Sequence, residues 1–314
     1  MKRLIVIIIA GFLGYSLFWY YEARNLRLAS EGWIADLREE GWQADTDLRV
    51  RGFPSRLDLT LSNLDLTRPD GLRLRAPVFQ VLGLSYKPGH HVLVLPKGAT
   101  LSRGKRGVSL TGDGLRASLV SDAQGRWLRL NIEADSIVIG TDRTSIPMRG
   151  VALSFHAIDA DRYRLNLDVQ ALDQIPPQET DLAMKIISEI GFDAPWHLKS
   201  LTAPSLPAPR QIDVKRASYN EGGVTLMLAG KLDISSDGIP AGALALRAQN
   251  WQTGLQQAEE NGRLPASAAQ ALEVILGMAA SLSGRADTLD LKLRFEGGIA
   301  YLGRFPLGPV PVLR

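Results

Sequence analysis

The sequence alternates apolar and polar residues in more than ten successive segments, and this pattern constrains the fold more than any other feature. The clearest segment is RGFPSRLDLTLSNLDLT, residues 51–67. Leucines alternate with polar residues from Leu57 to Leu61, and Leu64 and Leu66 continue the alternation on the opposite parity. Alternation with a period of two is typical of a strand with one apolar face. The change of parity predicts a bulge or a turn after Leu61, because the apolar face would otherwise turn outward.

A sheet with one apolar face must have that face covered by helices, closed on itself, or left available to an apolar partner. Beyond the N-terminal segments, helical periodicity marks only the stretches 180–190, 251–261 and 265–283, and three helices are too few to cover so large a sheet. The sequence therefore predicts a mainly β (α+β) fold. We expect a one-sided, curved antiparallel sheet that forms a trough or a partly closed barrel, with an N-terminal transmembrane helix and a few packing helices.

The N-terminus carries an uncharged run of 18 residues, 4–21, directly after Lys2 and Arg3. This length is at the threshold for a helix that crosses a bilayer, and the two cations favour a cytoplasmic start with the rest of the chain exported. A cleaved signal peptide is the alternative, but its apolar region is shorter and ends in small residues. This run ends in FWYY, which suits an interfacial aromatic belt. We expect a retained, single-pass anchor in the cell inner membrane, with the bulk of the chain in the periplasm.

The organisation that we predict has three parts. A transmembrane anchor at 1–24 precedes an N-terminal β-rich domain at 25–203, which begins with an amphipathic helix over 25–40. A C-terminal β/α part at 204–314 completes the sheet. The boundary rests on the proline-rich stretch 203–210, which is equally typical of a long ordered loop.

The composition argues against several classes of function. The chain has no cysteine, which excludes disulfides, thiol catalysis and cysteine-bound metal centres. Its net charge of +3 does not imply nucleic acid as a partner. The four histidines are expected in a turn (His90 and His91), on a polar strand face (His156) and in a core (His197) rather than at a metal.

The sequence also lacks the motifs of several common catalytic sites. The sequence contains no nucleophile elbow, no P-loop and no carboxylate pair with the spacing of a glycosidase. We therefore expect no catalytic residues, no metal, no cofactor and no enzymatic activity. A periplasmic hydrolase with a triad scattered through the fold remains a remote alternative.

The apolar wall of the predicted trough supplies the candidate binding residues. A sheet bent by bulges encloses its apolar face, and the leucines that follow the Gly-Phe-Pro sequence would line that face. The candidates for contact with an apolar ligand are Phe53, Leu57, Leu59, Leu61, Leu165, Leu167, Leu226, Leu228, Leu291 and Leu293.

Short motifs at both ends carry a resemblance. The anchor, the strand start GFPSRLDL at 52–59 and the ending GIAYLGRFPLGP at 298–309 resemble an uncharacterised alphaproteobacterial family of anchored envelope proteins, DUF2125, over most of the chain. More loosely, the anchor, the one-sided strands and the GPVP finish resemble the AsmA-like envelope proteins. That group is associated with β-grooves that carry lipid between membranes, and this chain is far shorter than its bridge-forming members. The resemblance implies lipid handling and brings no catalytic residues.

Two hypotheses for the function follow. The leading one is an inner-membrane-anchored periplasmic protein that binds a lipid or lipid-like apolar ligand by burial rather than chemistry. The alternative is an anchored assembly or scaffold protein whose sheet is closed by its own helices and whose partners are other envelope proteins.

We predict that the mature protein keeps residues 1–24, because the apolar run ends in aromatic residues and no small-residue cleavage pattern follows it. N-terminal sequencing of the protein isolated from membranes tests this expectation. A sequence that begins after Tyr21 would contradict the retained anchor.

Overall fold

The computed structural model describes residues 2–104, 106–141, 145–172, 183–201, 203, 205–260, 264–282, 285–303 and 305–313. Over these residues the chain forms seventeen strands, three α-helices and one 3-10 turn, and the strands pair antiparallel. The chain divides into two compact units, residues 1–151 and 152–314, each built on an antiparallel sheet. The mainly β fold, the antiparallel sheet and the long N-terminal helix are confirmed.

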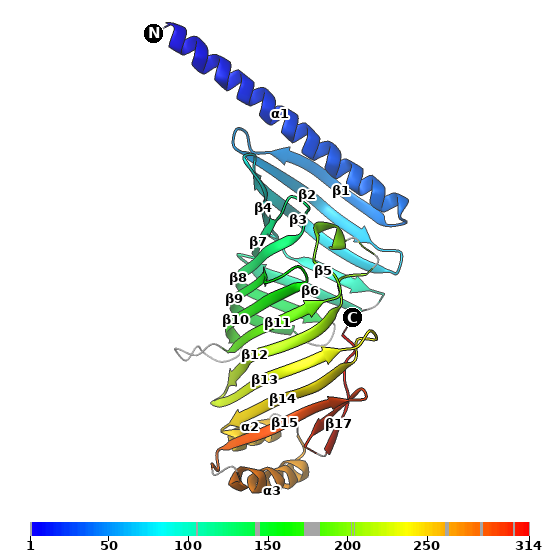
Figure 1. Ribbon diagram of the computed structural model, residues 1–314, viewed down its shortest axis with the longest axis vertical. Coiled ribbons are helices and arrows are strands. Elements are labelled where there is room, and N and C mark those ends of the chain that lie inside the picture. The colour runs from blue at the N-terminus through cyan, green and yellow to red at the C-terminus, as the bar shows by residue number, and fades with distance from the viewer. Residues whose placement is uncertain are drawn as a thin grey trace. The chain divides into compact units, whose positions relative to one another are not determined.

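The first unit is a helix followed by a meander of strands (Figure 1). Two long strands each pair with two shorter ones along one edge. β3 pairs with both β4 and β5, and β8 pairs with both β6 and β7. Between β3 and β8 the sheet therefore has two interrupted positions, one filled by β4 and β5 and the next by β7 and β6. The elements are α1 (Lys2–Glu39), β1 (Gln43–Arg51), β2 (Arg56–Thr67), β3 (Leu72–Leu84), β4 (Lys87–Val94), β5 (Ala99–Arg103), β6 (Arg106–Asp113), β7 (Arg116–Ser121) and β8 (Trp127–Thr141), with β9 (Ser145–Ala157) crossing the division.

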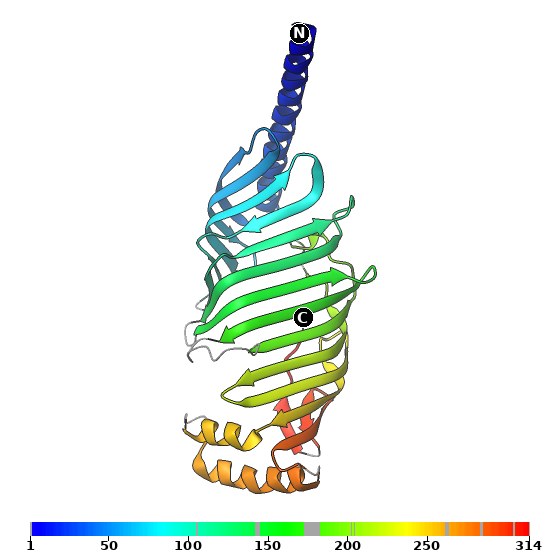
Figure 2. The ribbon, with the colours of Figure 1, turned by 90° about the vertical axis from the view of Figure 1, so that its left-hand side faces the viewer.

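The second unit continues as a meander in which each strand from β10 to β17 pairs with the next in sequence. Figures 1 and 2 show α2 and α3 beside β15 at one end of this sheet. The elements are β10 (Arg162–Leu172), β11 (Met184–Phe192), η1 (Leu198–Leu201), β12 (Pro209–Glu221), β13 (Val224–Ile234), β14 (Pro240–Gln249), α2 (Trp251–Glu260), α3 (Ala266–Leu282), β15 (Thr288–Glu296), β16 (Ile299–Leu302) and β17 (Phe305–Pro309).

The parity change predicted within residues 51–67 is confirmed. Leu59 and Leu61 before it and Leu64 and Leu66 after it are all buried. Between the two pairs lies Asn63, which is exposed and has a φ of 55°. Asparagine tolerates this left-handed conformation better than most residues. One residue out of register thus keeps both pairs of leucines on the same face of the sheet.

The irregularity at Asn63 belongs to a line that crosses the first unit. In β1 the register shifts between Asp45 and Asp47, opposite Ser62. Farther along, residues 95–98 separate β4 from β5, and residues 114–115 separate β6 from β7. Since β4 and β5 pair with the same edge of β3, they are two halves of one bent strand. We call this row of irregularities the fold line, because bulges and strand breaks of this kind bend a sheet and increase its local twist.

The C-terminal half of α1 packs on the apolar face of this sheet. Ile34 and Leu37 are buried in one cluster with leucines of β2 and with Ala44. The helix ends before Gly41, whose φ of 87° suits a helix C-terminus. The predicted amphipathic helix over 25–40 is therefore confirmed, and it continues without a break from the apolar N-terminal run.

One predicted element is wrong. Residues 180–190 were expected to be helical, but 184–190 belong to β11, while 180–182 lie outside the described residues. The isoleucines Ile186, Ile187 and Ile190 fit a helical stripe, yet β-branched side chains also favour strands. Hydrogen-bonded neighbours on both edges, β10 and β12, decide the outcome.

The helices expected over 251–261 and 265–283 are found as α2 and α3 over the described part of those stretches. Near the predicted division at 203, the described residues 203 and 205–208 lie between η1 and β12, inside the second unit.

Leu37 is 2% exposed, so Leu37→Ala is expected to lower the free energy of unfolding by about 2–5 kcal/mol. Leu28→Ala is the matched control, because Leu28 lies on the same helix and is 53% exposed; its effect should stay within about 0.5 kcal/mol. Denaturant unfolding of both variants in detergent measures the difference. Equal losses would contradict the packing of α1 on the sheet through this face.

Candidate functional site

The N-terminal half of α1 has no packing partner over most of its length. It is the one described helix that is long and apolar enough to cross a membrane, and its most apolar window has no buried residue. Large apolar side chains, from Leu4 to Leu13, are more than half exposed. A helix with this surface is stable in a lipid environment, where apolar side chains are solvated by acyl chains.

A cavity of about 410 Å³ opens where α1 and the sheet separate. One wall is the helix, with Leu26 and Ala29, and the other wall is the sheet, with Leu57 and Leu59 of β2 and Val81 of β3. This volume lies within the usual range of about 300–1,000 Å³ for small-molecule sites. The cavity is thus an apolar slot between the helix that carries the apolar run and the strands that follow it.

Gly83 in β3 leaves the space that deepens the cavity. A Cβ atom at this position would meet Nδ1 of His91 at 3.4 Å and the carbonyl oxygen of Leu57 at 3.5 Å. The backbone of Gly83 is not in the left-handed region, so no turn requires glycine there. The missing side chain therefore affects the volume of the slot rather than the course of the strand.

Polar side chains line the remaining part of the cavity. Glu22 and Asn25 come from α1, and Lys87 and His91 come from β4. Burial, with a smaller contribution from the charge of His90, lowers the pKa of His91. The cavity therefore combines leucine walls with a cation, a carboxylate and an amide, which is an arrangement suited to an amphiphile.

A second cavity of about 320 Å³ lies against the outer face of the same strands. Its lining includes Leu82, Leu84, His90 and Val92. Adjacent residues of a strand point to opposite faces, so His90 and His91 line different cavities. The sequence placed both histidines in a turn, which is wrong: they belong to β4, and Nε2 of His90 lies 3.1 Å from Oγ of Ser118.

Four of the predicted site residues belong to the first unit. Leu57 and Leu59 line the larger cavity. Leu61 is buried in the cluster under α1 and so contributes to packing. Phe53, in the turn between β1 and β2, is 46% exposed and has its ring edge-on to Trp19 and Phe12, at centroid distances of 5.4 and 6.1 Å.

The other six predicted residues belong to the second unit. Leu226 and Leu291 pack against the cluster that α2 and α3 help to bury, and Leu228 and Leu293 pack against the cluster around Leu244. The last two predicted residues, Leu165 and Leu167, are half-buried in β10. The structure thus gathers these leucines on one sheet face, where the four on β13 and β15 help to form a core.

Sequence reasoning missed the helix wall and the polar lining. Leu26 and Ala29 lie in the amphipathic helix expected over 25–40, but neither was named as a candidate binding residue. The apolar stripe of that helix could have indicated that Leu26 and Ala29 face the strands that follow. Lys87 and His91 carried no such signal, because their role depends on where β4 meets the helix.

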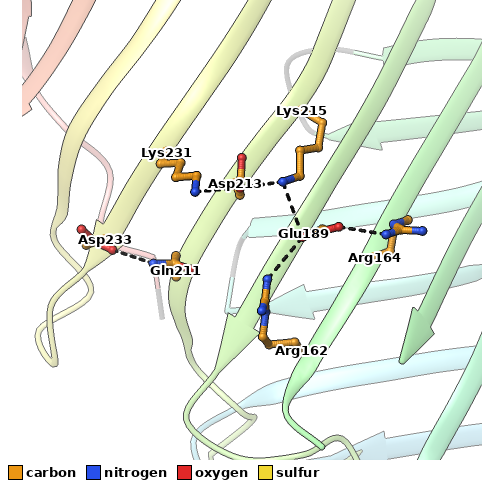
Figure 3. Close-up of polar contacts among 8 residues, drawn as sticks. All are labelled: Arg162, Arg164, Glu189, Gln211, Asp213, Lys215, Lys231 and Asp233. Carbon is orange, nitrogen blue, oxygen red and sulfur yellow. Dashed lines mark hydrogen bonds and ion pairs between the residues drawn. The ribbon is translucent and has the colours of Figure 1, made fainter. Parts of the chain in front are cut away.

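The polar face of β10 to β13 is a network of paired charges (Figure 3). Glu189 accepts from Arg164 and also pairs with Arg162 and Lys215, and Asp213 pairs with Lys215 and Lys231. The hydrogen bond from Arg164 is the main cause that lowers the pKa of Glu189, and the one from Lys215 does the same for the pKa of Asp213. These charges satisfy one another, so the network stabilises the sheet.

We expect His91→Gln to reduce the pH dependence of stability. Because the folded protein lowers the pKa of His91 from its ordinary value of 6.5, the unfolded chain takes up a proton first as the pH falls. His91 therefore contributes stability above about pH 6.5, and this contribution is lost as the pH falls through the lowered folded pKa. Thermal unfolding between about pH 7.5 and pH 5 compares the variant with the wild type.

The wild type should lose more stability than the variant over that interval. The lowered pKa values of Glu189 and Asp213 act at lower pH, because their contribution is lost only below ordinary values of 4.5 and 3.8. Further acidification should therefore destabilise both proteins alike. Parallel curves above pH 5 would contradict the burial of a neutral His91.

Comparison with known proteins supports the resemblance at the level of the family. No curated protein and no solved structure shows a significant match to the chain, and the looser link to the AsmA-like group stays a prediction. A family model described as "uncharacterized protein conserved in bacteria (DUF2125)" matches residues 19–311. This match covers most of the chain, and the protein therefore belongs to the DUF2125 family.

Proposed function

We propose that this protein is a single-pass membrane protein that binds a lipid or lipid-like apolar ligand beside the point where its anchor leaves the bilayer. The observation that carries the proposal is the cavity between α1 and strands β2 to β4. Its apolar walls continue from the exposed apolar surface of the same helix. An acyl chain could therefore pass from the bilayer into the slot without crossing water.

The topology that we propose places the N-terminus in the cytoplasm and the sheets in the periplasm. Lys2 and Arg3 precede the apolar run, and cations retained on the cytoplasmic side favour this orientation. The protein would then belong to the inner membrane of the cell envelope, with residues 4–21 as its anchor.

Binding in this proposal depends on burial of apolar surface. Each methylene group that leaves water contributes about 0.8 kcal/mol, and the leucines of β2 and α1 supply the surface that replaces water. The polar lining gives the ligand an orientation, with its head near Lys87 and Asn25. A volume of about 410 Å³ accommodates part of a lipid rather than a whole molecule, so the remainder would stay in the bilayer.

The proposal assigns no chemical step to the protein. Among the residues that the structure describes, no three His, Asp or Glu side chains come together as a metal site would require. The charged clusters of the second unit are paired internally (Figure 3). Binding, and transfer that follows from binding, is therefore the activity that we propose.

A scaffold without ligand is the second candidate, and one observation favours it. The apolar faces of the sheets are covered in part by the chain itself, with α1 on the first unit and α2 and α3 on the second. A scaffold would offer its polar faces to other envelope proteins. It would not need the slot at Gly83.

Gly83→Val tests the ligand site. The added side chain would enter the slot, and the variant should retain less co-purifying lipid than the wild type. Gly107→Val is the matched control, because Gly107 is also a strand glycine and its nearest neighbour to an added Cβ lies at 3.6 Å, outside the cavity. Native mass spectrometry of the full-length protein, released from detergent micelles, measures the bound lipid.

Lipid loss confined to Gly83→Val, with unchanged thermal unfolding, supports the proposal. A wild-type protein that carries no lipid, or equal retention by both variants, would overturn it and leave the scaffold.

A further inference from the structure

Two turns of the first unit lie against the apolar run of α1. In the turn between β1 and β2, Phe53 contacts Phe12 and Trp19 edge-on. Just beyond this turn, the carbonyl oxygen of Arg56 accepts a hydrogen bond of 2.7 Å from Nε1 of Trp19. In the turn between β3 and β4, Oγ of Ser85 lies 3.2 Å from the hydroxyl of Tyr15.

These contacts fix the depth of the turns relative to a bilayer. A hydrocarbon core of about 30 Å requires about 20 helical residues. The apolar run has 18 residues, 4–21, so all of it must lie within the membrane if it is to span the core. Tyr15 and Trp19 lie six and two residues before Tyr21, which is about 9 and 3 Å along the helix axis. Any group that touches their side chains while the run spans the membrane lies at or below the surface of the outer leaflet.

The exposed side chains of the two turns suit that depth. Tyr86 is 70% exposed, and Phe53 and Leu84 are also exposed. Basic residues flank the turns, with Arg56 after the first and Lys87 after the second. Aromatic residues at headgroup level with nearby cations are typical of membrane-interface segments.

Backbone carbonyl groups of the two turns accept hydrogen bonds from within the protein, as a poorly hydrated site requires. The carbonyl oxygen of Ser55 accepts from both the amide and the hydroxyl of Ser85, at 3.1 Å each. The carbonyl oxygen of Gly52 accepts from the amide of Arg56 at 2.9 Å. Polar backbone groups that enter lipid must be paired within the protein, and here the two turns pair with each other and with α1.

We propose that residues 52–55 and 84–86, the membrane tips, insert into the headgroup and acyl boundary of the outer leaflet beside α1. The partner is the lipid surface itself. Leu84 and Ser85 also line the cavity, so insertion of the tips would place its opening at the surface from which a lipid enters. The inference rests on the single-pass topology of the proposed function, but not on occupancy of the cavity.

Site-directed spin labelling tests the insertion, and a chain without cysteine needs no prior substitution. Three single-cysteine variants of the full-length protein are compared in vesicles of phosphatidylethanolamine and phosphatidylglycerol. Tyr86→Cys reports on a tip, Ile9→Cys on the middle of the apolar run, and Thr100→Cys on an exposed position of β5. Power saturation with oxygen and with a water-soluble nickel complex measures the exposure of each label to lipid and to water.

We expect the ratio of oxygen to nickel collisions at Tyr86→Cys to exceed that at Thr100→Cys several-fold and to approach that at Ile9→Cys. A tip label as accessible to nickel as Thr100→Cys, with Ile9→Cys protected, would overturn the insertion and leave the proposed function standing. Nickel access at Ile9→Cys would overturn the topology and, with it, both proposals. Circular dichroism of each variant checks that the sheet is retained.

Discussion

The packing of the C-terminal half of α1 on the apolar face of the first sheet is the interaction on which the rest depends. Leu37 and Ile34 are buried against leucines of β2, and large apolar side chains removed from water contribute about 1.5–3 kcal/mol each. Because the same helix continues into the apolar run without a break, this packing fixes the sheet of the first unit relative to that run. The place of the cavity follows from it, and so does the depth that we propose for the tips.

A cavity exists beside so well packed a helix because the packing does not extend along the whole of β2. Ile34 and Leu37 pack in one cluster with leucines on both sides of the bulge at Asn63, from Leu59 to Leu66. Leu57, nearer the start of β2, lies outside that cluster and faces the cavity. The space opens where α1 and the start of β2 are no longer in close contact. Gly83 enlarges that space by omitting a side chain.

Both units contain strands with one apolar face, but the two units cover that face in different ways. In the second unit the leucines of β13 and β15 are covered by α2, α3 and the residue Leu313 near the C-terminus. In the first unit the helix leaves Leu57 and Leu59 at the wall of a cavity. Alternation in a sequence shows that a strand has an apolar face, and it does not show what covers that face. The candidate residues of the second unit were chosen on alternation alone, and those on β13 and β15 help to form a core.

Much of the fold could be predicted from the sequence, because most of its helices and strands follow from short-range periodicity of the apolar residues. The long helix from the apolar run to Glu39, the successive strands and the parity change at Asn63 all follow from patterns of two or 3.6 residues. The strand β11 could not be predicted, since Ile186, Ile187 and Ile190 fit both periods and only pairing with β10 and β12 selects one. Two residues that line the cavity, Leu57 and Leu59, had been named from their alternation as parts of a trough in the sheet. The helix wall of the cavity, the gap over Gly83 and the polar lining were decided by tertiary structure alone, because they depend on which residues of distant elements meet where a helix and a bent sheet separate.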